Sequence, residues 1–260
     1  MFRLLTLFVL VCGVVESKII ETATIVDVIP LIEDNTWLIL DLDHTIYEGK
    51  EALGHSDWIY SIIDKKVEEE GITLEEAIDI SYPEWIKAKK RSSVKPVEEG
   101  FIPALLDLQK RNIVMMGLTQ QRPSLVPLTV RDLSSIGLSF LPTAPLANTF
   151  NIFTAGPATY TQGILFVGDY NKKGETFLKF LTMIDQRPQK VVFMDDKIKH
   201  VQEMEKTLTG QGIEYIGIHY TAIDFVEKVY YPEIAEIQRK LMSKTISNEA
   251  ARILIEHGLE

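Results

Sequence analysis

The sequence predicts an α/β fold with a doubly wound parallel sheet and a small helical cap inserted after one strand. Short apolar runs rich in β-branched residues alternate with segments of helical periodicity, as in parallel sheets covered on both faces. Several of these runs end abruptly in polar residues, at the sheet edge where ligands of such folds bind. About 70 residues separate the first two of these edges, far more than a plain crossover needs, which predicts the cap.

Length and composition are those of a globular protein. The chain has 260 residues, with 46% hydrophobic and 25% charged residues, enough for one large domain or for a core domain with an insertion. The net charge of −10 argues against a nucleic-acid partner, because phosphate backbones are bound through lysine and arginine. A small phosphorylated ligand is still compatible, since it needs only local positive charge.

The N-terminal residues 1–17 have the pattern of a signal peptide. Arg3 is followed by an uncharged stretch over residues 4–15, which is too short for a membrane span of about 20 residues. We therefore expect an exported protein, periplasmic or secreted, cut after residue 17 or after residue 13. An amphipathic or buried N-terminal helix is the alternative.

The single cysteine, Cys12, lies inside this segment, so the mature chain would contain no disulfide. A lipid-anchoring cysteine is the alternative, although Val11 stands where such signals prefer a small residue. No second apolar stretch reaches membrane length. We therefore expect no stable membrane span after signal removal.

The first half of the chain predicts one central strand followed by the helical insertion. Residues 18–35 are expected to be an extended lead-in, and residues 37–40 the buried strand. Thr73 and Glu76 form a capping box, and Pro83 is expected to end the helix that they open. The helices expected in the insertion cover residues 56–70, 73–82 and 84–91.

The second half predicts further strands and helices in alternation. The expected strands are 113–118, 190–194 and 213–218, with a hairpin over 149–169 whose second arm is 163–167. The expected helices are 102–111, 124–138, 174–184 and two between 232 and 257. The division that follows is a core domain of residues 18–47 and 96–260, with the cap at 48–95.

Charged and hydroxyl side chains recur at the ends of these strands or the starts of the following helices. Asp41 and Asp43 are separated by one residue, and two such carboxylates repel each other unless a cation or a shared proton intervenes. A divalent metal is the simplest resolution. The companion residues at the other edges are Thr119, Lys172 or Lys173, Asp195 and Asp196.

In this order and context the chain resembles the haloacid-dehalogenase-like (HAD-like) hydrolase superfamily over about residues 36–220. The four motifs that carry the resemblance are DLDHT, MMGLT, NKKG and VVFMDD. Details of the third motif region and of the strand IEYIGIHY resemble exported bacterial members close to the class B and C acid phosphatases.

The resemblance implies a HAD-like core and a role for each motif residue. Asp41 would be the nucleophile that forms an aspartyl-phosphate, and Asp43 the acid and base. Mg²⁺ would bind Asp41, the backbone carbonyl of Asp43 and Asp195, with Asp196 beside them or in the outer shell. Thr119 and a lysine would hold the phosphoryl oxygens. Lys173 is preferred for this lysine because it directly precedes a glycine, with Lys172 as the alternative.

The expected function is Mg²⁺-dependent hydrolysis of small phosphomonoesters. The alternatives are a catalytically weak phosphate-binding or interaction protein, and a phosphomutase. Arg122 could touch the substrate or lie at the surface, and the scattered histidines are expected to be structural. A basic stretch including Lys89 could attract an anion, but a solvated linker is the preferred interpretation. These basic residues are Lys87, Lys89, Lys90, Arg91 and Lys95.

Overall fold

The computed structural model describes residues 17–242 and 246–259. The expected signal segment and Cys12 lie outside this part of the chain, apart from Ser17, which begins the first strand. Within it an eight-stranded sheet has the order β1-β10-β9-β2-β5-β8-β7-β6. The first six strands pair in parallel, and β7 and β6 each pair antiparallel with the strand before them. Its strands are β1 (Ser17–Thr22), β2 (Thr36–Leu40), β5 (Val114–Thr119), β6 (Phe150–Phe153), β7 (Pro157–Thr161), β8 (Ile164–Phe166), β9 (Lys190–Asp195) and β10 (Glu214–Tyr220).

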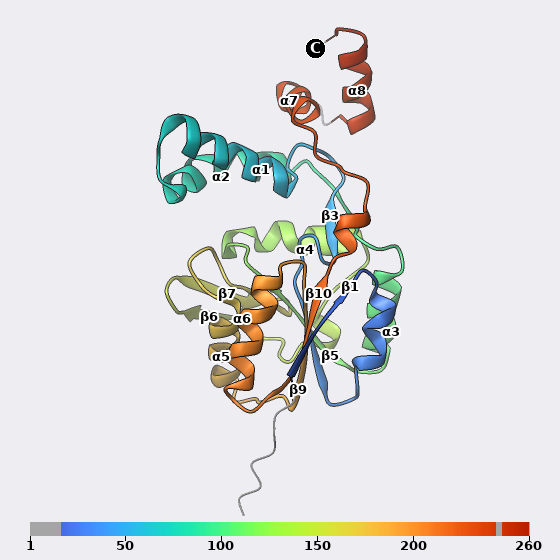
Figure 1. The fold of residues 1–260 in the computed structure, drawn as a ribbon, viewed down its shortest axis with the longest axis vertical. Helices are drawn as coiled ribbons and strands as arrows, with labels where there is room; N and C mark the ends of the chain where they lie inside the picture. Colours follow the sequence, from blue (N-terminus) through green and yellow to red (C-terminus); the bar gives the residue numbers. More distant parts are fainter. Residues whose placement is uncertain (1–16, 243–245, 260) are drawn as a thin grey trace, which may run out of the picture.

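Helices cover both faces of this sheet (Figure 1). Along β2, Leu38 and Leu40 face one apolar core, and Trp37 and Ile39 face the other. The first core is completed by α3 (Phe101–Lys110) and α4 (Val126–Ser135), and the second by α5 (Lys173–Met183) and α6 (Ile198–Thr209). The predicted doubly wound α/β fold is therefore confirmed.

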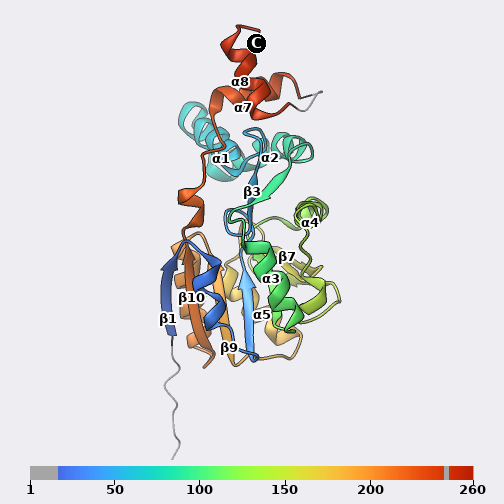
Figure 2. The same ribbon diagram turned by 90° about the vertical axis from the view of Figure 1, so that its right-hand side faces the viewer.

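A helical layer stands above the carboxyl edge of the sheet (Figures 1 and 2). Its base is a small antiparallel pair, β3 (Tyr47–Gly49) with β4 (Val94–Pro96). Between them run α1 (Ser56–Lys65), a π-helical turn (Lys66–Glu70) and α2 (Leu74–Lys89). The capping box expected of Thr73 and Glu76 is present at the start of α2.

The expectation that Pro83 ends this helix is wrong. The helix α2 continues through Pro83 to Lys89, so the separate short helix expected over 84–91 does not exist. Proline removes one backbone hydrogen bond, but packing can outweigh that cost. Here the residues beyond Pro83 include Trp85 and Ala88, which are buried in the core of the helical layer.

The two C-terminal helices, α7 (Pro232–Lys240) and α8 (Asn248–Glu256), lie with α1 and α2, away from the sheet (Figure 1). Ile234 and Ala251 share one apolar cluster with Trp58 and Trp85. The expected division assigned the whole of residues 96–260 to the core domain. The helices of this tail pack against the insertion, and the division into domains stays a prediction.

Two further expectations need correction. The lead-in contains a strand, β1, which pairs in parallel with β10 at the edge of the sheet. The expected hairpin is a three-stranded meander, β6-β7-β8, and its last strand pairs in parallel with β5. Within residues 17–242 and 246–259, no helix has the length and apolar character needed to cross a bilayer.

Candidate functional site

The carboxyl edge of the sheet brings the predicted residues together from four elements. Asp41 directly follows β2, Thr119 ends β5, Lys173 begins α5 and Asp195 ends β9. The parallel pairing of β2 with both β5 and β9 places these ends at one edge. Residues about 150 positions apart in sequence thus meet because the strands that carry them are neighbours.

Lys173 lies between the two strand-end acids. Its ammonium donates to Oδ1 of Asp41 and, over 2.6 Å, to Oδ2 of Asp195. All three side chains are buried, and Lys173 is 1% exposed. A buried charge needs such partners, because its desolvation is otherwise very costly. Lys172 instead lies at the surface and pairs with Glu175, so the geometry joins Lys173 to the acids.

Burial and neighbouring charges raise the pKa values of two of these acids and lower that of the third. Burial raises the pKa of Asp41 to about 7, against the opposing effect of Lys173. Burial and the neighbouring carboxylates likewise raise the pKa of Asp196 to about 8. Burial alone would raise the pKa of Asp195, but Lys173 and His200 hold it well below its usual value. Asp195 is therefore the most readily ionised of the three acids, whereas the pKa values of Asp41 and Asp196 lie near neutral pH.

Asp41, Asp195 and Asp196 form a cluster in which one oxygen from each lies within 4.8 Å of the others. Carboxylate oxygens are the hard ligands that Mg²⁺ prefers, so this donor set fits the ion. Neighbouring groups orient the acids. The Thr45 hydroxyl donates to Oδ2 of Asp41 over 3.4 Å, and the His200 ring lies 3.1 Å from both oxygens of Asp195.

Asp43 is not part of this cluster, and its carboxylate bonds to Gln121. The Gln121 amide donates to Oδ2 of Asp43 over 2.5 Å, and its carbonyl oxygen accepts from the hydroxyl of Thr129 on α4. Thr119 accepts the backbone N–H of Gln121 over 3.1 Å, which leaves its own hydroxyl proton available to a ligand. The two aspartates of DLDHT therefore have separate surroundings.

Lys89 reaches the site from the helical layer. Its ammonium lies 3.8 Å from Oδ1 of Asp43 and 3.6 Å from Oδ2 of Asp132, and it stands over the rings of Tyr47 and Trp85. The side chain is only 5% exposed. The preferred interpretation of this basic stretch as a solvated linker is therefore wrong for Lys89.

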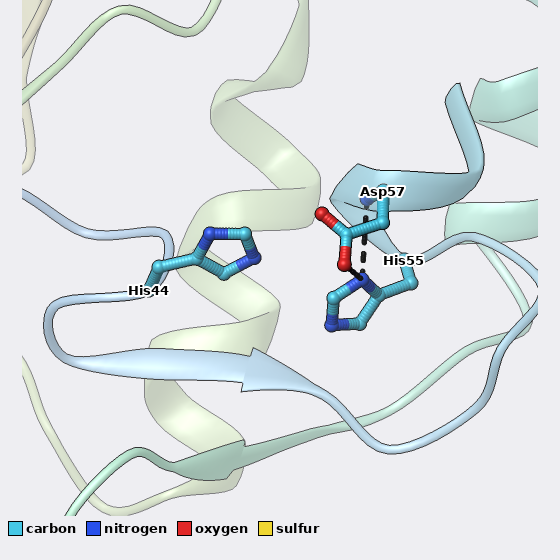
Figure 3. Close-up of side chains that lie close together, drawn as sticks. All are labelled: His44, His55 and Asp57. Carbon is cyan, nitrogen blue, oxygen red and sulfur yellow. Dashed lines mark hydrogen bonds and ion pairs between the residues drawn. The ribbon is translucent and has the colours of Figure 1, made fainter. Parts of the chain in front are cut away.

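His44, His55 and Asp57 form a second cluster, drawn in Figure 3. Its ligand atoms also lie within 4.8 Å of one another. However, Nδ1 of His55 accepts the backbone N–H of Asp57 over 3.2 Å and so caps α1. The His44 ring stacks on His55 with centroids 5.4 Å apart. The arrangement joins the loop after Asp41 to the first helix of the layer above.

A cavity of about 190 Å³ lies between the sheet edge and the helical layer. Asp41, Asp43, Thr119 and Asp196 line its lower side. Arg122 also lines it, held by Asp79 and Asp169 and stacked on Tyr82 with 4.4 Å between guanidinium and ring centroid. Lys197 lines it too, placed over the ring of Tyr60.

The sequence analysis did not assign three residues to the site. Gln121 lies two residues after the predicted strand-end Thr119, so its position was a usable signal. His200, expected to be structural, lies one helical turn after Asp195 and Asp196, which is a weaker signal. Lys89 was noted only within a basic stretch that could attract an anion, and its contact with Asp43 depends on the packing of α2.

A family model whose description reads "Protein of unknown function (DUF2608)" matches residues 18–252. The chain belongs to the DUF2608 family. This DUF2608 chain is 30% identical to a Chlamydia muridarum protein, over 99% of both chains, and 32% identical to one from Chlamydia trachomatis serovar D, over 87% of this chain and 84% of the relative. Both relatives bear the name "Putative outer membrane protein".

Among solved structures, the DUF2608 chain is similar to a haloacid dehalogenase-like family hydrolase from Streptococcus pneumoniae. The TM-score is 0.42 and the sequence identity 13%, with 70% of this chain and 93% of the other covered.

Proposed function

We propose that the protein is a Mg²⁺-dependent phosphohydrolase of the HAD-like type, acting on small phosphomonoesters through an aspartyl-phosphate. The observation that carries the proposal is the buried Asp41 beside Lys173, facing a cavity that Asp43 and Thr119 also line. This arrangement supports the roles of Asp41 as nucleophile, Asp43 as acid and Thr119 as a phosphate-binding donor around one space.

The first step would transfer the phosphoryl group to Asp41. A carboxylate oxygen of Asp41 forms a bond to phosphorus as the bond to the leaving oxygen breaks, and Asp43 gives that oxygen its proton. Lys173 and Thr119 would stabilise the charge on the phosphoryl oxygens. Asp43 is held by Gln121 and Lys89, apart from the contacts of Asp41 with Lys173, so the two carboxyl groups can take different roles.

The second step would release phosphate. Asp43, now ionised, takes a proton from a water molecule whose oxygen attacks phosphorus, and the bond to Asp41 breaks. Asp41, Asp195 and Asp196 would hold Mg²⁺. When bound, the ion would supply positive charge against the repulsion between an anionic phosphate and an anionic nucleophile.

Replacing Asp41 by asparagine tests this proposal. The variant should lose hydrolysis of phenyl phosphate in the presence of Mg²⁺, because an amide cannot form the phosphoenzyme. Asp107→Asn, at an exposed position on α3, is the matched control and should keep full activity. Circular dichroism would establish that both variants fold. Full activity of Asp41→Asn would refute the mechanism, and activity toward a sugar acceptor instead of water would indicate the phosphomutase.

We also propose that residues 48–95 act as a cap over the site and that the chain is exported. The helices of this segment line the cavity from above. Export is supported by the pattern of residues 1–17 and by the names of the chlamydial relatives. Detection of the protein, shortened at its N-terminus, in a cell-envelope or culture-medium fraction would test it.

A further inference from the structure

The two sides of the cavity differ in chemistry. The sheet side carries carboxylates, a hydroxyl, amides, imidazoles and the cations Arg122 and Lys197, whereas the cap side is mainly aliphatic and aromatic. The cap residues that line it are Ser56, Ile59, Tyr60 and Ile63 from α1, and Ile78, Tyr82 and Trp85 from α2.

Helical periodicity explains why these residues share one side. On α1 they recur at intervals of three and four residues between 56 and 63, and on α2 at intervals of four and three between 78 and 85. Residues so spaced lie on one face of a helix. Each helix therefore turns an apolar face toward the sheet edge.

We infer that the leaving group of the substrate is a small apolar ring, so that the preferred substrates are single-ring aromatic or arylalkyl phosphomonoesters. This inference rests on the proposed function for the same site. The phosphoryl group belongs among the polar residues of the sheet side, which puts the alcohol portion against Ile59, Ile78 and Trp85.

The cap side gives a sugar little to bind. Each buried sugar hydroxyl would need a hydrogen-bond partner, and an unpaired polar group in such a place reduces binding strongly. Among the seven lining residues of α1 and α2, only the hydroxyls of Ser56, Tyr60 and Tyr82 could hydrogen bond to a ligand, because the indole N–H of Trp85 already donates to the carbonyl of Gly54. Aromatic rings next to the space favour a planar ring by stacking.

The volume also limits the ligand. An apolar cavity of about 150 Å³ is large enough to take up benzene, and this one has about 190 Å³. A single ring with its phosphoryl group fits that scale. A base together with a ribose is larger than this and would extend beyond the cavity, so we do not expect nucleotides to be preferred substrates.

The test compares benzyl phosphate with ethyl phosphate and glycerol phosphate, since all three release an alkoxide and differ mainly in the group that meets the cap. Benzyl phosphate should have at least about a tenfold higher kcat/KM. Equal or higher values for ethyl phosphate, glycerol phosphate or adenosine monophosphate would overturn the inference, while the proposed hydrolysis would still stand.

The variant Ile78→Asn should lower the ratio of benzyl to ethyl turnover by about tenfold, because it puts an amide on the apolar face. Ile80→Asn is the matched control on the same helix, since Ile80 is 56% exposed and does not line the cavity. An unchanged ratio in a folded Ile78→Asn protein would contradict the inference.

Binding provides a readout that does not depend on turnover. Benzylphosphonate should bind the wild-type protein with Mg²⁺ at least about tenfold more tightly than methylphosphonate, as measured by calorimetry. If no ester is hydrolysed but this preference holds, the proposed function fails and the ligand class stands. Equal affinities, or no binding of either phosphonate, would overturn the ligand class.

Discussion

Lys173 explains how three buried charged groups share one site. Burial alone would lower the pKa of its ammonium, but Asp195 and Asp41 hold that pKa above its ordinary value. The lysine therefore stays charged throughout the physiological range and partly neutralises the acids. Lys173 hydrogen bonds to Asp41 and Asp195 but not to Asp196, which remains the acid most dependent on another cation.

Mg²⁺ should consequently bind more tightly as the pH rises. The metal must displace protons from Asp41 and Asp196, whose pKa values lie at about 7 and about 8. Affinity should increase between pH 6 and pH 9, by up to about tenfold per unit for each proton displaced. Isothermal calorimetry across this range would measure it, and a constant affinity would contradict the assignment.

Thermal stability should follow the same linkage. Because the folded pKa values of Asp41 and Asp196 are raised, their protonated forms stabilise the metal-free protein at low pH, and this contribution is lost as the pH rises through 7 to 8. Asp195 contributes a stability that changes only in acid, and Lys173 one that changes only in strong base. The difference in Tm with and without Mg²⁺ should therefore widen from pH 6 to pH 9. The exposed Asp107→Asn control should show the same widening.

Lys89 lies outside the four motifs but reaches Asp43, so its replacement should affect catalysis. Lys89→Met should lower kcat for benzyl phosphate about tenfold. The ionised form of Asp43, which acts as the base of the second step, would lose the cation that lies 3.8 Å away, while KM changes little. Lys89→Arg should restore part of kcat. The neighbouring Lys90→Met, at an exposed position, is the control. A change in stability with unchanged kcat would assign Lys89 to structure alone.

Among the elements, α2 contributes most to the upper side of the site, because one of its faces carries Ile78, Tyr82, Trp85 and Lys89. These positions span twelve residues on one side of the helix, so a break at Pro83 would have separated Trp85 and Lys89 from Ile78 and Tyr82. Local signals could not foresee this continuity. The residues after Pro83 are held by contacts with α7 and α8, which lie about 150 residues away in the sequence.

The start of α2 depends on its capping box. Thr73→Ala should lower the free energy of unfolding by about 1 kcal/mol, because the N–H of Glu76 loses the hydroxyl that accepts it over 3.2 Å. Thr73→Ser keeps that acceptor and should be nearly neutral. Urea denaturation would measure both, and equal effects of the two substitutions would show that the cap hydrogen bond is unimportant.

The strand and motif pattern was predictable because both signals are local. Apolar runs identified the parallel strands β2, β5, β9 and β10, and the polar residues after the first three led to Asp41, Thr119 and Asp195. By contrast, the edge strand β1 is half-exposed and mixed in composition, so no apolar run marked it. Which groups meet across the sheet edge depended on strand order, which a single sequence does not contain.

At the scale of the whole molecule, the C-terminal helices α7 and α8 provide a third connection between the cap and the sheet. Beyond β3 and β4, the segment before α7 rises from the sheet to the cap (Figure 2). Polar contacts fasten it. Gln238 accepts the backbone N–H of Leu53 over 2.8 Å, and Asn248 accepts that of Ala52 over 2.9 Å. Gln238 also donates to Asn248 over 2.9 Å.

Gln238→Leu should therefore loosen the cap without disturbing the sheet. The buried N–H of Leu53 would lose its acceptor, at a cost of about 1–3 kcal/mol. Hydrogen exchange should accelerate in α1 and α7 and remain slow in β2 and β9. Gln202→Leu, exposed on α6, is the control and should change neither region. Uniform acceleration across the sheet would show that cap and sheet unfold as one unit.

The placement of Lys173 between Asp41 and Asp195 has a consequence for the order of assembly. A cluster of acids alone would repel itself until an ion arrived, and the polypeptide would then need its metal in order to fold. Here the counter-charge is covalently part of the chain and forms with α5. The protein should therefore fold first and bind its metal afterwards, and chelators should abolish its activity without unfolding it.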